Sequence, residues 1–156
     1  LKLRHCGEQI AGGAVDEAGR ARLGEQFAAL VYEGVLAAPL LPGVDTTLRD
    51  LADRQIPAFV VSGTPAEEMR RIVQAKGLDR FFLEVHGSPR PKASIIREIL
   101  ARHRFTPDRC LFVGDALADY RAARDTGLHF LGIVPEGATS LFPEGTPCSA
   151  AVHLPA

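Results

Sequence analysis

Two aspartates, Asp115 and Asp119, stand just after an apolar run and could together bind a metal ion. Asp115 falls where a predicted strand ends, and Asp119 follows it by about one turn of a predicted helix. Both carboxylates can therefore approach the same point at the end of the strand. Paired carboxylates with open positions suit Mg²⁺, which completes its coordination with water and substrate phosphate. A simpler alternative is equally open at this point: Asp115 caps the helix, and Asp119 is a solvated surface charge.

A serine and a lysine elsewhere in the chain could bind phosphate. Ser62 and Gly63 end an earlier apolar run, and a hydroxyl beside the free amides of a helix N-terminus can hold a phosphate oxygen. Lys92 opens another predicted helix, where its charge opposes the helix dipole. Neutralising a phosphate or a group of carboxylates would account for that position. The alternatives are an ordinary turn serine and a solvated lysine.

Short apolar runs alternate with helical patterns from residue 44 onward. The predicted strands span residues 56–61, 81–85, 109–113 and 129–134, and the predicted helices span 65–76, 91–103 and 116–125. This alternation predicts a parallel sheet covered on both faces, an α/β doubly wound fold. Ligands bind beyond the carboxyl ends of the strands in such sheets. The candidate residues Ser62, Gly63, Lys92, Asp115 and Asp119 all fall at that edge.

The ends of these helices carry their own signals. Thr64 is a good N-cap for the helix at 65–76, because its side-chain oxygen can accept from the free amides of the first turn. Gly77 and Gly127 follow the first and third helices and are expected to end them, as glycine often does.

Residues 1–38 have a different pattern from the rest of the chain. The segment from 15 to 36 is rich in alanine, glutamate and arginine and predicts a helix, and Pro39, Pro42 and Gly43 then interrupt it. We interpret residues 1–38 as part of a helical lobe and residues 39–156 as the α/β core. The tail from 143 to 156 is turn-rich and carries no predicted helix or strand.

The composition and charge of the chain limit the binding partners and the cellular compartment that we expect. Lysine and arginine total 18 against 19 for aspartate and glutamate, so the net charge is −1 and argues against nucleic-acid binding. Three widely spaced cysteines suggest neither a disulfide framework nor a zinc site. We find no signal peptide and no apolar stretch that predicts a membrane span, so we expect a cytoplasmic protein without a membrane partner. Neither the substrate nor the oligomeric state follows from the sequence.

Three motifs resemble those of the haloacid dehalogenase (HAD) superfamily, in its phosphoglycolate-phosphatase-like branch with a helical cap. The stretch from Val60 to Pro65 is similar to the second motif of the family, Lys92 stands where the third has its lysine, and Gly114-Asp115 with Asp119 matches the fourth. The stretch Leu41-Pro42-Gly43-Val44 is similar to the return from cap to core. The resemblance covers about residues 20–135, and the fourth motif is its most specific part.

The resemblance implies a Mg²⁺-dependent phosphatase that acts on a small phosphorylated metabolite through an aspartyl-phosphate intermediate. Asp115 would be the main metal ligand, and Asp119 would support the metal or its waters. Ser62, with Gly63, would bind a phosphate oxygen, while Lys92 would neutralise and orient the phosphoenzyme. The scheme agrees with general phosphoryl-transfer chemistry, in which a metal, a lysine and oriented amides stabilise the transferring group.

The first motif of the family, an apolar strand followed by DxDGT, is not found. Asp45 has no apolar strand before it and is better interpreted as a charge in the first turn of a helix. In the family this strand lies between the strands that here end at Ser62 and at Gly114. We therefore expect the chain to be the C-terminal part of a longer protein, with a core that lacks its first strand.

Other functions stay open beside the phosphatase hypothesis. A dehalogenase, phosphonatase or mutase would keep the same fold, although dehalogenases need no magnesium and the paired aspartates favour phosphate chemistry. A non-catalytic or truncated relative would keep the fold without the nucleophile.

Overall fold

The computed structural model describes residues 32–153, and the chain divides into two compact units, Leu1–Pro39 and Leu40–Ala156. In the first unit, residues 32–37 are helical, which agrees with the end of the helix predicted at 15–36. The rest of that helix lies outside the described residues. Assignment of this unit to a helical cap therefore stays a prediction.

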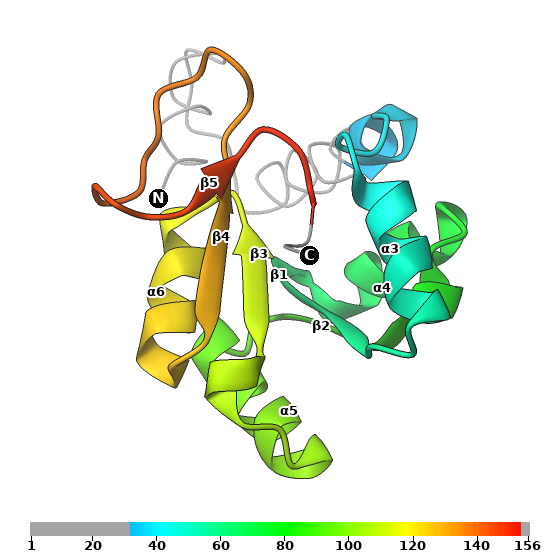
Figure 1. Ribbon diagram of the computed structural model, residues 1–156. Helices are drawn as coiled ribbons and strands as arrows, with labels where there is room; N and C mark the ends of the chain where they lie inside the picture. Colours follow the sequence, from blue (N-terminus) through cyan, green and yellow to red (C-terminus); the bar gives the residue numbers. More distant parts are fainter. Residues whose placement is uncertain (1–31, 154–156) are drawn as a thin grey trace, which may run out of the picture. The chain divides into compact units, whose positions relative to one another are not determined.

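The second unit alternates strands and helices as the sequence predicts (Figure 1). Its elements are α3 (Val44–Asp53), β1 (Ala58–Pro65), α4 (Ala66–Ala75), η1 (Asp79–Phe81), β2 (Phe82–Ser88), α5 (Lys92–His103), η2 (Pro107–Arg109), β3 (Leu111–Gly114), α6 (Leu117–Thr126), β4 (His129–Ile133) and β5 (Cys148–Ser149). All the strand pairs are parallel, with β1 beside β2, β3 beside β4 and β4 beside β5. The predicted α/β fold is confirmed.

The strands form two separate sheets, β1–β2 and β3–β4–β5. Within residues 32–153, β1 pairs only with β2 and β3 only with β4, so each has one edge without a strand partner there. The strands with an unpaired edge are also less buried than β4, which is paired on both sides. No residue of β1 is fully buried and Leu111 of β3 is 37% exposed, whereas Phe130 and Ile133 of β4 are buried. The apolar sequences of β1 and β3 are those of central strands, but half of their pairing is absent from the described chain.

Two groups of apolar side chains hold the helices onto these sheets. Ala123 of α6 is completely buried, which lets the helix lie close to Phe130 of β4, and Phe142 packs edge-on against Phe130 with ring centroids 5.2 Å apart. In α5, which lies at the helix predicted at 91–103, Ile95, Ile96 and Ile99 are all buried. Burial of each such side chain contributes roughly 1.5–3 kcal/mol relative to exposure.

Two details of the elements correct the sequence predictions. Thr64 does not cap α4, because β1 runs on to Pro65 and the helix has no side-chain cap. The turn-rich tail, for which no element was predicted, contains β5, which adds a parallel strand to β4. Beyond β5, the amide of Val152 donates to the carbonyl of Pro42 (2.9 Å), and Thr47 of α3 donates to the carbonyl of Val152 (2.7 Å). The tail thus joins the start of α3 to the β3–β4–β5 sheet.

The ends of α4 and α6 match the sequence predictions. Gly77 and Gly127 follow them with φ values of 66° and 76°, a left-handed conformation that favours glycine. No helix within residues 32–153 is long and apolar enough to cross a membrane.

The Glu84 carboxylate on β2 binds side chains at the C-terminal end of α5. Glu84 Oε1 lies 2.6 Å from His103 Nε2, and its Oε2 lies 2.7 Å from His86 Nε2 and 2.6 Å from Arg102 Nη1. An ionised carboxylate only accepts, so both histidines donate. The bond from His103, supported by those from His86 and Arg102, lowers the pKa of Glu84 from its ordinary 4.5 to about 2. The ionised form of Glu84 therefore stabilises the fold.

We predict that Glu84→Gln lowers the free energy of unfolding at pH 7 by about 1 kcal/mol or more, because charge-assisted hydrogen bonds are lost. Since the folded pKa is depressed, the wild-type advantage is complete above pH 4.5 and declines as the pH falls toward 2. Chemical denaturation of both proteins across this range measures the difference. Glu98→Gln, which alters an exposed pair with Arg90, is the matched control and is expected to change little. A difference for Glu84→Gln that does not depend on pH would contradict the prediction.

Candidate functional site

The candidate residues come together where β1 and β3 end and where α5 begins. Ser62 and Gly63 belong to the last part of β1, and Lys92 is the first residue of α5. Asp115 follows β3 directly, and Asp119 is the third residue of α6. The order of elements therefore brings five polar or flexible positions to one edge of the second unit, as the parallel arrangement predicts.

Lys92 and Asp119 form the central contact of this site. The Lys92 ammonium donates to Asp119 Oδ1, and their side chains are only 20% and 7% exposed. A lysine and an aspartate this far from solvent need each other, because an unpaired charge at either position would be strongly destabilising. Both simpler alternatives fail here, since Lys92 is not a solvated lysine and Asp119 is not a solvated surface charge.

Asp119 also stabilises the first turn of its own helix, α6. Its Oδ2 accepts a hydrogen bond from the backbone amide of Ala116 (3.1 Å). Ala116 is the N-cap residue of α6, in an extended conformation, and its side chain has no polar atom to serve as a cap. Both carboxylate oxygens of Asp119 are thus engaged, one by Lys92 and the other by the backbone.

Gly114 makes the position of Asp119 possible. A Cβ atom at residue 114 would lie 2.5 Å from Asp119 Cβ, 2.6 Å from its Cγ and 2.7 Å from its Oδ2. Such distances are far inside van der Waals contact, so only glycine leaves room for the carboxylate to turn back over the end of β3. The glycine of the Gly-Asp pair is a packing requirement of the site.

Asp115 is placed differently from Asp119. Its side chain is exposed and makes no hydrogen bond or ion pair with the described part of the chain. The N-cap of α6 is Ala116, so the alternative that Asp115 caps the helix is wrong. Asp115 is an open carboxylate next to the buried pair.

Ser62, Gly63 and Lys92 line one pocket of about 380 Å³. The Ser62 hydroxyl accepts a hydrogen bond from the Thr64 amide (3.1 Å), which fixes its oxygen at the end of β1. The rest of the lining comes from the segment before α5 and from one face of α6: Arg90, Pro91, Ala93, Ala118, Arg121, Ala122 and Asp125. Asp115 and Asp119 are not part of this lining.

Arg90 and Arg121 are pocket residues that sequence reasoning did not single out. For Arg121, the spacing of residues along α6 could have shown which neighbours it lies beside. Positions 118, 121, 122 and 125 fall on one side of a helix, so Arg121 shares a face with Ala118 and Ala122. The direction of that face depends on packing against α5 and could not be derived from spacing.

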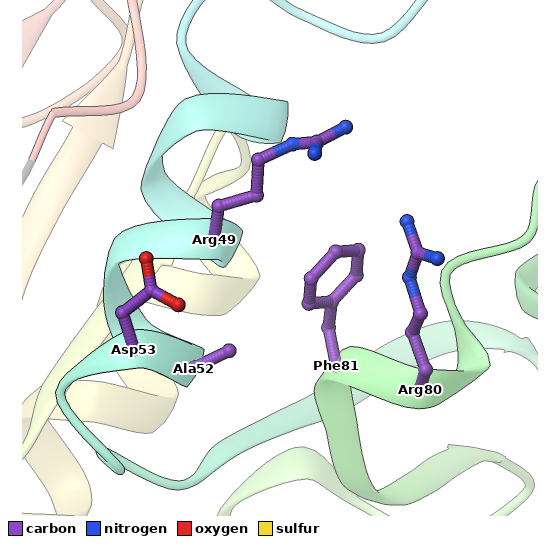
Figure 2. Close-up of a pocket in the computed structure, with 5 residues that line it drawn as sticks. All are labelled: Arg49, Ala52, Asp53, Arg80 and Phe81. Atoms are coloured by element: carbon purple, nitrogen blue, oxygen red, sulfur yellow. The ribbon is translucent and has the colours of Figure 1, made fainter.

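A second pocket, of about 260 Å³, lies between α3 and η1 and has none of the candidate residues (Figure 2). Its lining is Arg49, Ala52, Asp53, Arg80 and Phe81. The Arg80 guanidinium lies over the Phe81 ring, 4.8 Å from its centroid, and Arg49 is paired with Asp45. Asp45 lies in the first turn of α3, as the sequence predicts. The contacts around this pocket are those of a charged surface.

The family can be assigned from the sequence profile of a group described as haloacid dehalogenase-like hydrolases, which matches residues 4–127. That range is most of the chain and includes all five candidate residues. The chain belongs to this family. The resemblance inferred from the three motifs is therefore confirmed. As a haloacid dehalogenase-like protein it also shares its fold with solved relatives.

Named relatives of this haloacid dehalogenase-like chain are phosphoglycolate phosphatases. It is 29% identical over 111 residues to that of Synechococcus elongatus, covering 70% of this chain and 52% of the relative. It is 26% identical over 99 residues to that of Vibrio cholerae, covering 60% and 44%. A crystal structure of a predicted phosphoglycolate phosphatase from Haemophilus somnus matches with a TM-score of 0.72 and 26% identity, over 87% of this chain and 63% of that one. The chain spans about half of the length of the two named relatives.

The described residues provide carboxylates but no complete metal site. Within residues 32–153 no group of three or more His, Cys, Asp or Glu side chains could hold a metal ion. Mg²⁺ in phosphate-transfer sites often uses only one or two carboxylates, together with water and substrate oxygens. Asp115 offers one such carboxylate, whereas both oxygens of Asp119 already have partners. Of the two candidate carboxylates, only Asp115 therefore has oxygens without a partner within residues 32–153.

We predict that Gly114→Ala disrupts the Lys92–Asp119 pair, because the new methyl group would overlap the Asp119 carboxylate. The expected loss is about 1–3 kcal/mol in the free energy of unfolding. Thermal and chemical denaturation of the full-length protein measure it. Gly63→Ala is the matched control, since Gly63 also lies near the end of a strand and nothing lies within 4 Å of a Cβ at that position. Equal stability of the two variants would show that residue 114 has more room than the structure indicates.

Proposed function

We propose that the complete protein is a phosphatase that hydrolyses a small phosphate ester, with Mg²⁺ as cofactor. The observation that carries this proposal is the buried Lys92–Asp119 pair in contact with a pocket that also contains Ser62. A largely buried ammonium fixed at the beginning of a helix favours an anionic ligand. The phosphoglycolate phosphatases among the relatives support the same class of substrate.

Lys92 would bind and orient the phosphate. An ammonium group has three N–H donors, and Asp119 Oδ1 takes one of them, which leaves donors for phosphate oxygens. Asp119 holds the ammonium in place and prevents it from turning toward solvent. In this role Asp119 acts through Lys92 and through the Ala116 amide, which donates a hydrogen bond to it.

Ser62 and Gly63 would complete the phosphate site. The Ser62 oxygen already accepts from the Thr64 amide, so its own proton remains free to be donated to a phosphate oxygen. Gly63 is exposed, and a Cβ atom added to it would meet nothing within 4 Å, so the backbone there is open to a ligand. Together these groups surround a phosphate with donors and with one fixed positive charge.

Asp115 would hold the metal. Its open carboxylate at the end of β3 is the hard oxygen ligand that Mg²⁺ prefers. When bound, Mg²⁺ would supply positive charge that stabilises the transferring phosphoryl group. The Lys92–Asp119 pair, fixed through Gly114, would keep the phosphate adjacent to that carboxylate.

The nucleophilic aspartate would come from a strand between β1 and β3. These two apolar strands each have an edge without a partner among residues 32–153, and their side chains are only half-buried. A parallel strand inserted there would pair both edges and would end beside Lys92 and Asp115. An aspartate at its end could attack the phosphate and form the aspartyl-phosphate that the family resemblance implies.

Two other functions stand as alternatives. A dehalogenase, phosphonatase or mutase would use the same strand and the same Lys92, so the fold does not separate them. A non-catalytic or truncated protein is favoured by one observation, the absence of an Asp-x-Asp sequence from residues 32–153. The buried Lys92–Asp119 pair and the open Asp115 carboxylate support the phosphatase over that alternative.

We expect Asp115→Asn in the full-length protein to lower Mg²⁺-stimulated hydrolysis of an aryl phosphate by roughly 100-fold or more, because a charged ligand of the metal is lost. Circular dichroism checks that the fold is intact. Asp79→Asn, an exposed aspartate of η1, is the control and should leave turnover unchanged. Unchanged turnover in Asp115→Asn would remove this residue from the metal site.

Comparing Asp115→Asn with Asp119→Asn distinguishes the roles of the two carboxylates in metal binding. Loss of Asp119 should lower turnover without changing the Mg²⁺ concentration that gives half-maximal activity, because its oxygens bond to Lys92 and to Ala116. A large increase in that concentration would make Asp119 a direct metal ligand instead.

The 156-residue chain expressed alone is expected to show no phosphatase turnover and an incompletely cooperative unfolding transition. The reason is that the edges of β1 and β3 have no partner strand in the described chain. Activity and calorimetric measurements on the purified chain check both points. Measurable turnover would show that the nucleophile lies within these residues.

A further inference from the structure

Strand β1 contains a bulge at the residues proposed to bind phosphate. Val61 of β1 pairs with His86 of β2. The next pair is Pro65 with Ser88, and the register shifts between the two pairs. The three residues 62–64 of β1 therefore lie opposite a single residue of β2. A bulge of this kind bends its strand and changes the direction of its side chains, and bulges are frequent next to active sites.

The single residue opposite this bulge is Gly87, and its lack of a side chain gives the bulge room. A Cβ atom at Gly87 would lie 2.2 Å from the carbonyl oxygen of Thr64 and 2.7 Å from the backbone nitrogen and Cα of Ala66. All three atoms belong to the backbone, so they could move only together with the bulge or with the start of α4. Gly87 is buried and its φ is not positive. The space above Gly87, and not its backbone conformation, therefore requires a glycine.

Thr64 connects Gly87 to the Ser62 hydroxyl. The Thr64 amide donates a hydrogen bond to the Ser62 oxygen (3.1 Å), while the Thr64 carbonyl lies against Gly87. The position of the hydroxyl therefore depends on how closely Thr64 can approach β2. These contacts lie on the side of β1 that pairs with β2, and not at its other edge, which has no strand partner within residues 32–153.

We propose that Gly87 is a positioning residue for phosphate binding, because it allows the bulge to form and thereby fixes the direction of the Ser62 hydroxyl. The inference rests on the proposed function, since it takes Ser62 to donate to a phosphate oxygen. Gly87 does not touch the ligand and acts through Thr64 and Ser62. A side chain at position 87 would push Thr64 away from β2 and move the hydroxyl, although every side chain that contacts the ligand would still be present.

A double-mutant cycle of Gly87→Ala and Ser62→Ala tests the proposal, with kcat/KM for Mg²⁺-stimulated hydrolysis of an aryl phosphate by the full-length protein as the readout. Ser62→Ala should lower kcat/KM by about tenfold or more, as expected for loss of a hydrogen bond to a charged group. Gly87→Ala should lower it by a similar factor. Because both changes remove the same interaction, the double variant should lie within about twofold of the less active single variant, whereas independent losses would multiply.

Val73→Ala is the control for a loss of stability alone. Val73 is buried in α4, near the end of that helix that is remote from Ala66. Its truncation should lower the thermal midpoint and leave kcat/KM unchanged, with every variant assayed well below its own midpoint. If Gly87→Ala does not fold, deletion of Gly63 takes its place in the cycle. The deletion shortens the bulge by one residue without adding an atom at Gly87, and its loss should likewise fail to multiply with that of Ser62→Ala.

The outcomes separate this inference from the proposed function. Losses that multiply in the double variant, or an unchanged kcat/KM in Gly87→Ala, would overturn the role of Gly87 and leave the phosphate site at Ser62 in place. An unchanged kcat/KM in Ser62→Ala would instead contradict the phosphate site itself, and the inference with it. Similar single losses that do not multiply support both proposals.

Discussion

The buried ion pair between Lys92 and Asp119 is the contact on which the rest of the site depends. It joins the first turn of α5 to the first turn of α6, and neither charge could stay at its depth without the other. Its geometry requires Gly114, because any side chain there would occupy the position of the Asp119 carboxylate. One short segment from the end of β3 to the start of α6 therefore provides the glycine, the open Asp115 and the buried Asp119.

The same ion pair has a structural role in a unit whose strands do not form one continuous sheet. Helix α5 packs on β1 and β2, and α6 packs on β3 and β4, while α5 and α6 contact each other. The two sheets are thus connected through their helices and through the tail, which adds β5 to β4 and bonds to α3 by way of Val152. At the opposite end of α5, Glu84 binds His103 and Arg102 and fixes the helix on β2.

Much of the fold was predictable, because local patterns agree with the final structure. Apolar runs predicted β1, β2, β3 and β4, and helical spacing predicted α5, in which the structure buries Ile95 and Ile96. The failures have a common cause. Thr64 is a good cap in isolation, but pairing with β2 extends β1 past it. The two residues of β5 have no local signal, because their strand conformation depends on the edge of β4, which is distant in sequence.

For the site, the sequence by itself determined the residue types and their edge of the sheet, because parallel strands place their carboxyl ends together. It also carried the motifs that identify the family. Only the tertiary structure decided how Asp115 and Asp119 differ. Their spacing is compatible with two equivalent ligands, but packing of α5 against α6 brings Lys92 to Asp119 and leaves Asp115 open. The tertiary structure also decided that Arg121 lines the pocket, because the elements that pack against α6 determine which side of the helix faces the pocket.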